Sequence, residues 1–164
     1  MISETSPSEY AVAVQIHAVV QAAYAIEAEL IGCADFPPLK ISIQELQTSS
    51  DTFLGFNISG ILVAVLSFNE QSNSAVITRL IVSPAHFRQG IATALVSEFE
   101  RRVPHGRVLT VSTATANAPA VSLYQSLKYV ATYLSCSPQG ISLVHFSKCN
   151  AVNGPITSSP ICSV

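Results

Sequence analysis

Charged residues are scarce in this sequence, because Asp, Glu, Lys and Arg together make up only 11% of its 164 residues. Eight of them are basic, they are scattered along the chain, and the net charge is −2. No basic stripe is therefore available to neutralise the phosphates of DNA or RNA, and we expect no nucleic-acid partner. Hydrophobic residues, at 49%, exclude a disordered chain and favour one well-packed domain.

Closely spaced cysteines and histidines, which could bind a metal or form disulfides, are also missing. The four cysteines, Cys33, Cys136, Cys149 and Cys162, lie far apart, with no C-x-x-C pair and no histidine at zinc-ligand spacing. A chain of this length can build a core without either kind of staple. We therefore expect free thiols and no metal.

Signals for export are absent as well. No basic residue precedes Lys40, so the positive region of a signal peptide and the arginines of a transit peptide are lacking, and we expect a cytoplasmic protein. Residues 10–26 are rich in Ala, Val and Ile, but Gln15, His17 and Gln21 interrupt them and no basic flank follows. The segment is interpreted as a buried helix, with no membrane partner.

Helix signals dominate the first third of the chain. Ser8 is the expected N-cap of a helix over residues 9–31, and Gly32 is expected to end it. Pro37 and Pro38 lack amide protons and break the chain before a second, short helix at residues 42–48. This pair of helices could form one wall of a pocket.

Strand signals begin at residue 52. Apolar and β-branched segments separated by polar or glycine-containing turns predict six strands, at residues 52–56, 61–68, 75–82, 108–112, 129–136 and 141–146. Two helices alternate with them, at residues 91–102 and 119–127. We expect one domain over residues 1–148 and a flexible tail over residues 149–164.

The loop before the helix at residue 91 suits a phosphate group. A helix N-terminus offers unpaired amide protons and a partial positive charge. Gly90 lets the chain bend close to a ligand, Ala92 keeps the approach open, and Arg88 adds a cation. The lysine of a Walker loop and the three-glycine dinucleotide fingerprint are both missing, so ATP and NAD are poorly supported.

Two motifs in order give this loop a specific interpretation. The predicted strand ends in Leu80-Ile81-Val82-Ser83-Pro84 and leads into His86-Phe87-Arg88-Gln89-Gly90-Ile91-Ala92-Thr93-Ala94-Leu95. Further on, the spacing N-x-x-A-x-x-L-Y-x-x-L is met by Asn117, Ala120, Leu123, Tyr124 and Leu127. Together these motifs resemble those of the GNAT family of N-acetyltransferases, over residues 52–148.

The resemblance implies an α/β (α+β) fold. Its central sheet would be mixed, with about six or seven strands flanked by helices. An N-terminal helix pair would wall the site, and two parallel strands, ending near Val82 and Ser112, would splay apart where coenzyme A (CoA) binds.

The resemblance also implies acetyl-CoA as the acyl donor and assigns site residues. The backbone of Leu80, Ile81 and Val82 would bind the pantetheine arm, Asn117 would contact the CoA arm, and Tyr124 would protonate the sulfur. The pyrophosphate would lie on Arg88, Gln89, Gly90, Ile91, Ala92 and Thr93. Asn117 also fits a plain helix cap, and Tyr124 a core aromatic.

Two positions depart from the family pattern. Phe87 stands where Gln or Arg is usual, and Lys128 stands where Gly usually follows the leucine, so CoA affinity is the property at stake. The strand carboxylate that serves many relatives as general base is also missing, because Thr78 and Arg79 occupy that place. The candidates for the base are Glu27, Glu29, Asp35 and Glu70. We expect His86 at the surface beside the cofactor, and His17 either packed or exposed on its helix.

The expected function is an acetyl-CoA-dependent transfer of an acetyl group to a primary amine of a small molecule or a protein. The amine would attack directly in a ternary complex, without a cysteine intermediate. Two alternatives remain: a CoA-binding sensor or interaction module with weakened catalysis, and an unrelated α/β domain. The chain is expected to be a monomer or a homodimer.

Overall fold

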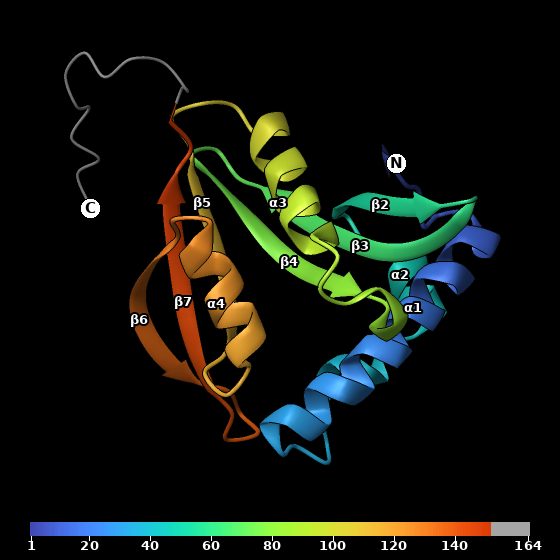
Figure 1. The fold of residues 1–164 in the computed structure, drawn as a ribbon, viewed down its shortest axis with the longest axis horizontal. Coiled ribbons are helices and arrows are strands. Elements are labelled where there is room, and N and C mark those ends of the chain that lie inside the picture. Colours follow the sequence, from blue (N-terminus) through green and yellow to red (C-terminus); the bar gives the residue numbers. More distant parts are fainter. Residues whose placement is uncertain (152–164) are drawn as a thin grey trace.

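The computed structural model describes residues 1–151, which form a seven-stranded mixed sheet in the order β1-β2-β3-β4-β5-β7-β6 (Figure 1). The strands are β1 Ile2–Glu4, β2 Thr52–Ile58, β3 Ile61–Glu70, β4 Ser74–Val82, β5 Val108–Ala114, β6 Val130–Cys136 and β7 Ser142–Cys149. The α-helices are α1 Tyr10–Ile31, α2 Ile43–Gln47, α3 Ile91–Arg102 and α4 Ala118–Ser126, and short 3-10 helices cover η1 Pro37–Lys40 and η2 Pro84–His86. The predicted fold class is confirmed.

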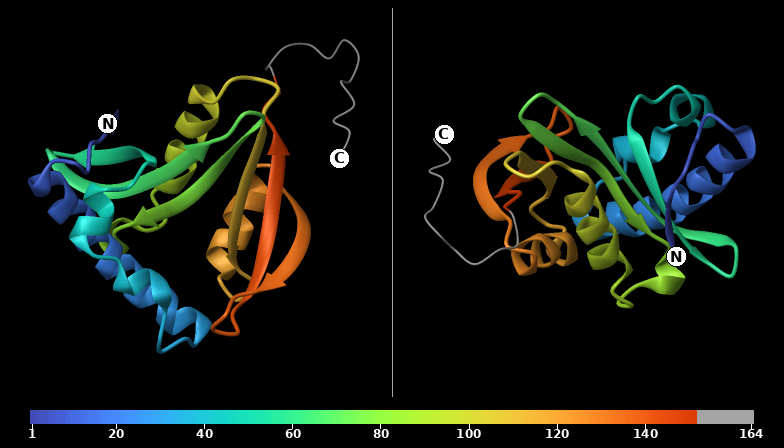
Figure 2. Two further views of the ribbon diagram at one scale, coloured as in Figure 1. Left: turned by 180° about the vertical axis from the view of Figure 1, so that it is seen from behind. Right: turned by 90° about the horizontal axis from the view of Figure 1, so that it is seen from above.

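Both faces of the sheet are covered over β2, β3 and β4, which explains why β3 reads as a nearly continuous apolar segment, whereas β6 at the sheet edge is exposed along its whole length. Helices α1 and α2 pack on one face through Ile16, Val20 and Leu46, whereas α3 and α4 pack on the other (Figure 2). Side chains alternate between the two faces along a strand. Phe53 accordingly faces α1 and Leu54 faces α3.

The start of α1 differs from the prediction. Its N-cap is Glu9, and Ser8 instead shares a 2.7 Å hydrogen bond with the hydroxyl of Ser6. No side chain caps the helix, so the predicted Ser8 cap is wrong. By length and composition α1 could cross a membrane; 33% of that stretch is buried inside the structure, where residues such as Ile16 and Val20 pack on the sheet.

The first hairpin closes more tightly than expected. Strand β2 runs on to Ile58, so the turn to β3 consists of Ser59 and Gly60 alone, with φ angles of 50° and 81°. Two consecutive left-handed residues are typical of the hairpin turn that matches the natural twist of paired strands. Strand β1 was not predicted; it pairs with β2 from Ile2 to Glu4.

The last strand runs slightly beyond residue 146, where the sequence predicted its end. Strand β7 continues to Cys149, and the amide nitrogen Nδ2 of the buried Asn150 donates hydrogen bonds of 2.7 and 3.0 Å to the carbonyl oxygens of Val103 and Glu100. These bonds hold the end of β7 against the C-terminus of α3. The remainder of the predicted tail, residues 152–164, lies outside the described residues.

The feature that positions the site is the separation of β4 from β5. The two strands pair in parallel from Ser74 to Ile77 on β4 and from Val108 to Val111 on β5, and no further. Strand β4 continues to Val82, paired with β3 only, and β5 continues to Ala114, paired with β7 only. The strands therefore diverge toward their carboxyl ends (Figure 1).

Candidate active site

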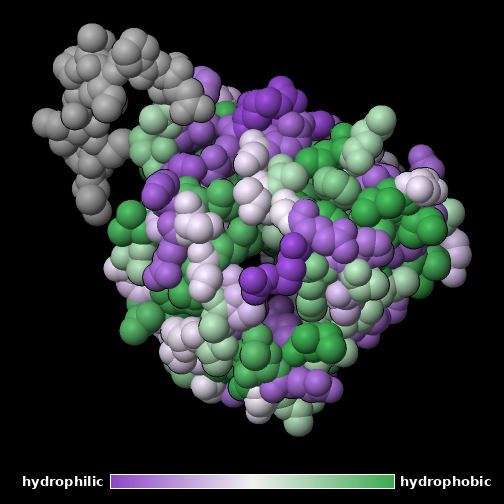
Figure 3. Space-filling model, viewed as in Figure 1, coloured by the Kyte–Doolittle hydropathy of each residue, from purple (hydrophilic) through white to green (hydrophobic). Residues whose placement is uncertain are grey.

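A cavity of about 850 Å³ fills the space where β4 and β5 diverge. Figure 3, in the same view as Figure 1, shows a hollow near the middle of the molecule. Residues of α1, η1, β4, the loop before α3, β5 and α4 line it. All the predicted site residues line it except Gln89, which is exposed beside it.

The free edge of β4 presents backbone groups to this cavity. The N–H of Ser83 donates a 2.7 Å hydrogen bond to the carbonyl oxygen of Val63 on β3. Because backbone groups alternate in direction along a strand, those of Val82 and Leu80 point the opposite way, toward the gap. Peptide groups at an unpaired edge need a hydrogen-bonding partner, and an extended ligand amide could provide one.

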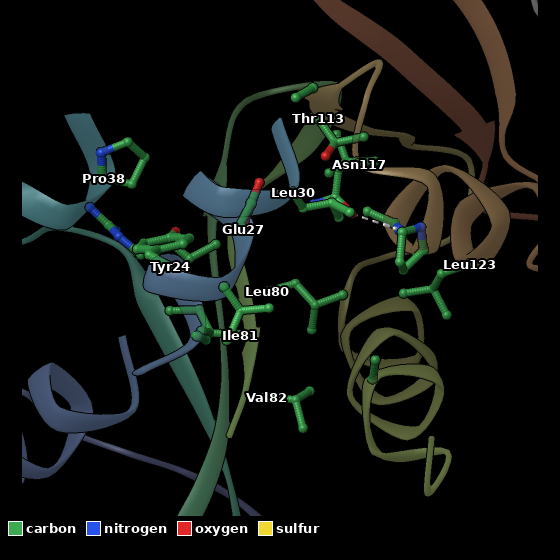
Figure 4. Close-up of a pocket in the computed structure, with 18 of the residues that line it drawn as sticks. Tyr24, Glu27, Leu30, Pro38, Leu80, Ile81, Val82, Thr113, Asn117 and Leu123 are labelled. Carbon is green, nitrogen blue, oxygen red and sulfur yellow. Dashed lines mark hydrogen bonds between the residues drawn. The ribbon is translucent and has the colours of Figure 1, made fainter. Parts of the chain in front are cut away.

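Ile81 differs from its two neighbours. By the same alternation its backbone groups face β3, and its side chain is only 2% exposed, packed among residues of α1. Figure 4 shows Leu80 and Ile81 pointing to opposite sides of the strand. The resemblance implied backbone contacts from all three residues; the register with β3 turns the backbone groups of Leu80 and Val82 toward the gap and those of Ile81 toward β3.

The loop before α3 has the shape of an anion site. Arg88 and Gly90 both adopt left-handed conformations, with φ angles of 63° and 75°, and Gly90 is the N-cap of α3. No side chain caps this helix, and no acidic residue lies in its first turn. The amide protons of Ile91 and Ala92 are therefore open to a ligand, and the positive end of the helix dipole faces the cavity mouth.

Asn117 has the capping role that the sequence left open. Its side-chain oxygen accepts a 3.2 Å hydrogen bond from the N–H of Ala120, in the first turn of α4. The residue also lines the cavity. Its oxygen caps the helix, and of the two N–H groups on its amide nitrogen one faces Glu27 and the other is available to a ligand.

Tyr124 lies deep in the cavity wall. It is 4% exposed, and its ring packs against Tyr129 and Phe146 at centroid distances of 5.7 and 5.9 Å. No hydrogen bond joins its hydroxyl to any other described residue. Burial raises the pKa of Tyr124, and the nearby charge of Glu27 adds to the rise, so the phenol stays protonated and able to donate a proton.

Three residues that the sequence analysis did not connect meet at the other end of the cavity. Tyr24 and Glu27 lie three positions apart on α1 and so share one helical face, and Arg79 lies opposite on β4. Burial raises the pKa of Tyr24 to about 12, the cation of Arg79 opposing this rise and the charge of Glu27 adding to it. A polar and aromatic strip on an otherwise apolar helix was the available sequence signal.

The candidate bases separate clearly. Glu27 lines the cavity, whereas Glu29 is exposed outside it. Asp35 forms a 2.6 Å ion pair with Lys40 at the surface, and Glu70 pairs with Arg107 at the far end of the sheet. Burial raises the pKa of Glu27, and a hydrogen bond from Asn117 opposes that rise.

Arg79 is held by a network that the pattern did not reveal. Its guanidinium donates to the Asp51 carboxylate at 3.2 Å and to the Ser67 hydroxyl at 3.4 Å. Thr78 donates a 2.6 Å hydrogen bond to the same carboxylate oxygen of Asp51. The charge of Arg79 is thus compensated. Its position is fixed by Asp51, which directly precedes β2, and by Ser67 on β3.

The sequence singled out four other residues, namely His86, His17, Phe87 and Lys128. His86 is half-buried, not at the surface, and lines the cavity with its Nδ1 atom buried and unpaired among the described residues. His17 is half-buried on α1, and its Nε2 atom lies 3.2 Å from the carbonyl oxygen of Ile41. Phe87 lines the cavity entrance and is largely exposed, and Lys128 takes a left-handed φ of 68° where glycine would be unstrained.

No group of three or more His, Cys, Asp or Glu among residues 1–151 could hold a metal ion. Cys33 and Cys136 are free thiols, and neither lines the cavity.

The chain matches the family described as "Acetyltransferase (GNAT) domain" over residues 32–149. It is 33% identical over 146 residues to the UPF0157 protein YqkA of Bacillus subtilis (strain 168), an alignment that covers 89% of this chain and 43% of YqkA. The chain therefore spans less than half the length of that relative.

Solved structures share the fold at low sequence identity. The ribosomal-protein-S18-alanine N-acetyltransferase from Escherichia coli superposes with a TM-score of 0.68 at 19% identity, over 97% of this chain and 99% of that one. The yncA protein from Salmonella typhimurium, solved with its cofactor acetyl-CoA, gives a TM-score of 0.68 at 14% identity, over 99% and 98% of the two chains.

Proposed function

Because the chain belongs to the acetyltransferase (GNAT) domain family, we propose that it transfers the acetyl group of acetyl-CoA to a primary amine. The observation that carries the proposal is the gap between β4 and β5, with unpaired backbone groups along one side and an uncapped helix N-terminus at its mouth. An arm with amide groups suits the strand edge, and a pyrophosphate suits the helix.

The donor would lie in an extended form along β4. Its amide groups would pair with the backbone of Leu80 and Val82, and its pyrophosphate would meet the amide protons at the start of α3, with Arg88 beside them. The thioester would then lie near Tyr124, which lines the opposite wall of the gap. Asn117 would contact the arm through the second N–H of its amide nitrogen, since its oxygen caps α4 and its first N–H faces Glu27.

The reaction would proceed by direct attack in a ternary complex. A backbone N–H of β4 would polarise the thioester carbonyl, and the amine would attack its carbon. The departing thiolate would take the proton of the Tyr124 hydroxyl, which burial keeps protonated. Support for this order comes from the cavity of about 850 Å³, which is lined by α1 and β4 on one side and by α4 on the other.

An acceptor screen tests the proposal. The protein is incubated with acetyl-CoA and a panel of primary amines, and free CoA thiol is measured together with the mass of each amine product. Amine-dependent thiol release with a matching acetylated product is expected. Acetyl-CoA binding without transfer to any amine would refute the enzymatic proposal and favour the sensor or interaction module.

A further inference from the structure

The carboxylates of the described residues differ sharply in how their charge is compensated. Six are ion-paired with lysine or arginine: Glu4, Asp35, Asp51, Glu70, Glu98 and Glu100. Glu45 belongs to the capping box of α2. Glu9 and Glu29 are exposed to water. Glu27 alone among these ten is half-buried, unpaired by any described cation and in the cavity wall.

A half-buried carboxylate without a counter-ion is costly unless a ligand supplies the missing charge. The groups around it offer no such charge, since Tyr24 and Tyr124 are neutral and Asn117 is an amide. The cation of Arg79 is already engaged by Asp51. The site therefore has one uncompensated negative charge, which complements one ammonium group.

The wall around this charge is apolar. Tyr24 and Phe36 meet edge to face at a centroid distance of 5.6 Å, and Pro37, Pro38 and Leu30 continue the lining. Figure 4 shows Glu27 and Leu30 projecting from α1 into the space that Asn117 and Thr113 border on the other side. No second unpaired carboxylate lines this space in residues 1–151, so a second ammonium group would find no partner.

Resting on the proposed acetyl transfer, we propose that the acceptor is a primary monoamine with an apolar body, and that Glu27 binds its ammonium group and takes its proton. The apolar body lies against Tyr24, Phe36 and the two prolines. Glu27 is then a catalytic residue, because its carboxylate touches the reacting nitrogen. Burial, which raises the pKa of Glu27, makes it a stronger base than an exposed carboxylate.

The protons balance through two groups. Glu27 takes one proton from the ammonium ion, and the free amine forms a C–N bond with the thioester carbon. As the C–S bond breaks, Tyr124 gives its proton to the sulfur. The nitrogen of the newly formed amide still carries one extra proton, which it gives to the Tyr124 oxygen. The products are the amide and the CoA thiol, and Glu27 releases its proton to water.

The base is tested with Glu27→Gln, and Glu29→Gln on the same helix serves as the matched control. Glutamine keeps the shape but cannot take the proton, so kcat/KM should fall about 100-fold or more near pH 7. The variant should then depend on free amine, and its kcat/KM should rise about tenfold per pH unit between about pH 7 and 9, more steeply than the wild type. Acetyl-CoA affinity should not change.

Equal rates and equal pH profiles for the wild type and Glu27→Gln would overturn the role of Glu27. The Glu29→Gln variant should behave as the wild type; a matching loss in both would show a general charge effect and would equally overturn it. These outcomes need a wild type that transfers acetyl groups. A wild type inactive on every amine instead contradicts the proposed function itself.

The acceptor class is tested by comparing phenethylamine with spermidine, kanamycin and an alanine-initiated peptide. The structure predicts a kcat/KM at least tenfold higher for phenethylamine than for either polycation. Replacing Phe36 by Ala should lower this preference, since it removes the ring that packs on Tyr24. A preference for spermidine, kanamycin or the peptide would overturn the monoamine proposal and leave the test of Glu27 intact.

Discussion

Replacing Tyr124 by Phe separates the chemistry of the hydroxyl from the packing of the ring. The ring contacts with Tyr129 and Phe146 remain, and the hydroxyl makes no hydrogen bond to a described residue that could be lost. The free energy of unfolding should therefore change by less than about 0.5 kcal/mol. The melting temperature should shift by less than about 2 °C.

The catalytic effect of the same change should be large. Without the phenol the thiolate must leave unprotonated, and loss of a general acid typically lowers the rate by about 100-fold or more, or about 2.7 kcal/mol in the barrier. The assay is initial-rate thiol release at saturating acetyl-CoA, with affinity measured in parallel by calorimetry. Affinity should be nearly unchanged, because the ring that packs in the wall is still present.

Tyr133→Phe is the matched control, because Tyr133 is 60% exposed on β6, outside the cavity lining, where it stacks on His145. It should keep full activity. An unchanged kcat for Tyr124→Phe would refute the assignment of Tyr124 as the acid. An equal loss in both variants would point to the assay or to folding and would equally remove the support for that role.

Four further substitutions test the local geometry of the strand, the helix cap and the turn. Val82→Pro removes an N–H that faces the gap, so the fold should persist in circular dichroism while calorimetry shows at least a tenfold loss of acetyl-CoA affinity; Ile81→Pro removes one that faces β3 and should instead unfold the protein. Asn117→Ala deletes the cap of α4 and should lower the unfolding free energy by about 1 kcal/mol in urea titration. Lys128→Gly relieves a left-handed residue and should raise the melting temperature by about 2 °C; a lower value would contradict the strain.

The parts of the site that are local in sequence could be predicted. Gly90 at the start of α3 and Asn117 at the start of α4 carry their conformational preferences with them, so the loop and cap could be placed from the sequence. The sequence also predicted that Leu80 and Val82 lie at the end of β4. It could not predict the direction in which their backbone groups point, because that direction depends on the register with β3, which the hydrogen bond from Ser83 to Val63 fixes.

The acceptor end of the site depends on tertiary packing. Glu27 and Tyr124 are brought to one cavity because α1 packs on one face of the sheet while α4 packs on the other, and the diverging strands open the layer between them. Helical spacing separates Glu27 from Glu29, because Glu27 continues the buried series Ile16, Val20 and Ala23 at steps of three and four residues and Glu29 does not. The local pattern does not reveal that this position lines a cavity, because the opposite wall comes from distant parts of the chain.

Binding of acetyl-CoA in the gap between β4 and β5 is the central claim, and a calorimetric titration tests it most directly. Acetyl-CoA should bind at one site per chain, acetyl-pantetheine should bind at least tenfold more weakly because it lacks the pyrophosphate that meets the start of α3, and Val82→Pro should weaken both. Equal affinity for the two compounds, or no measurable heat with acetyl-CoA, would contradict the account.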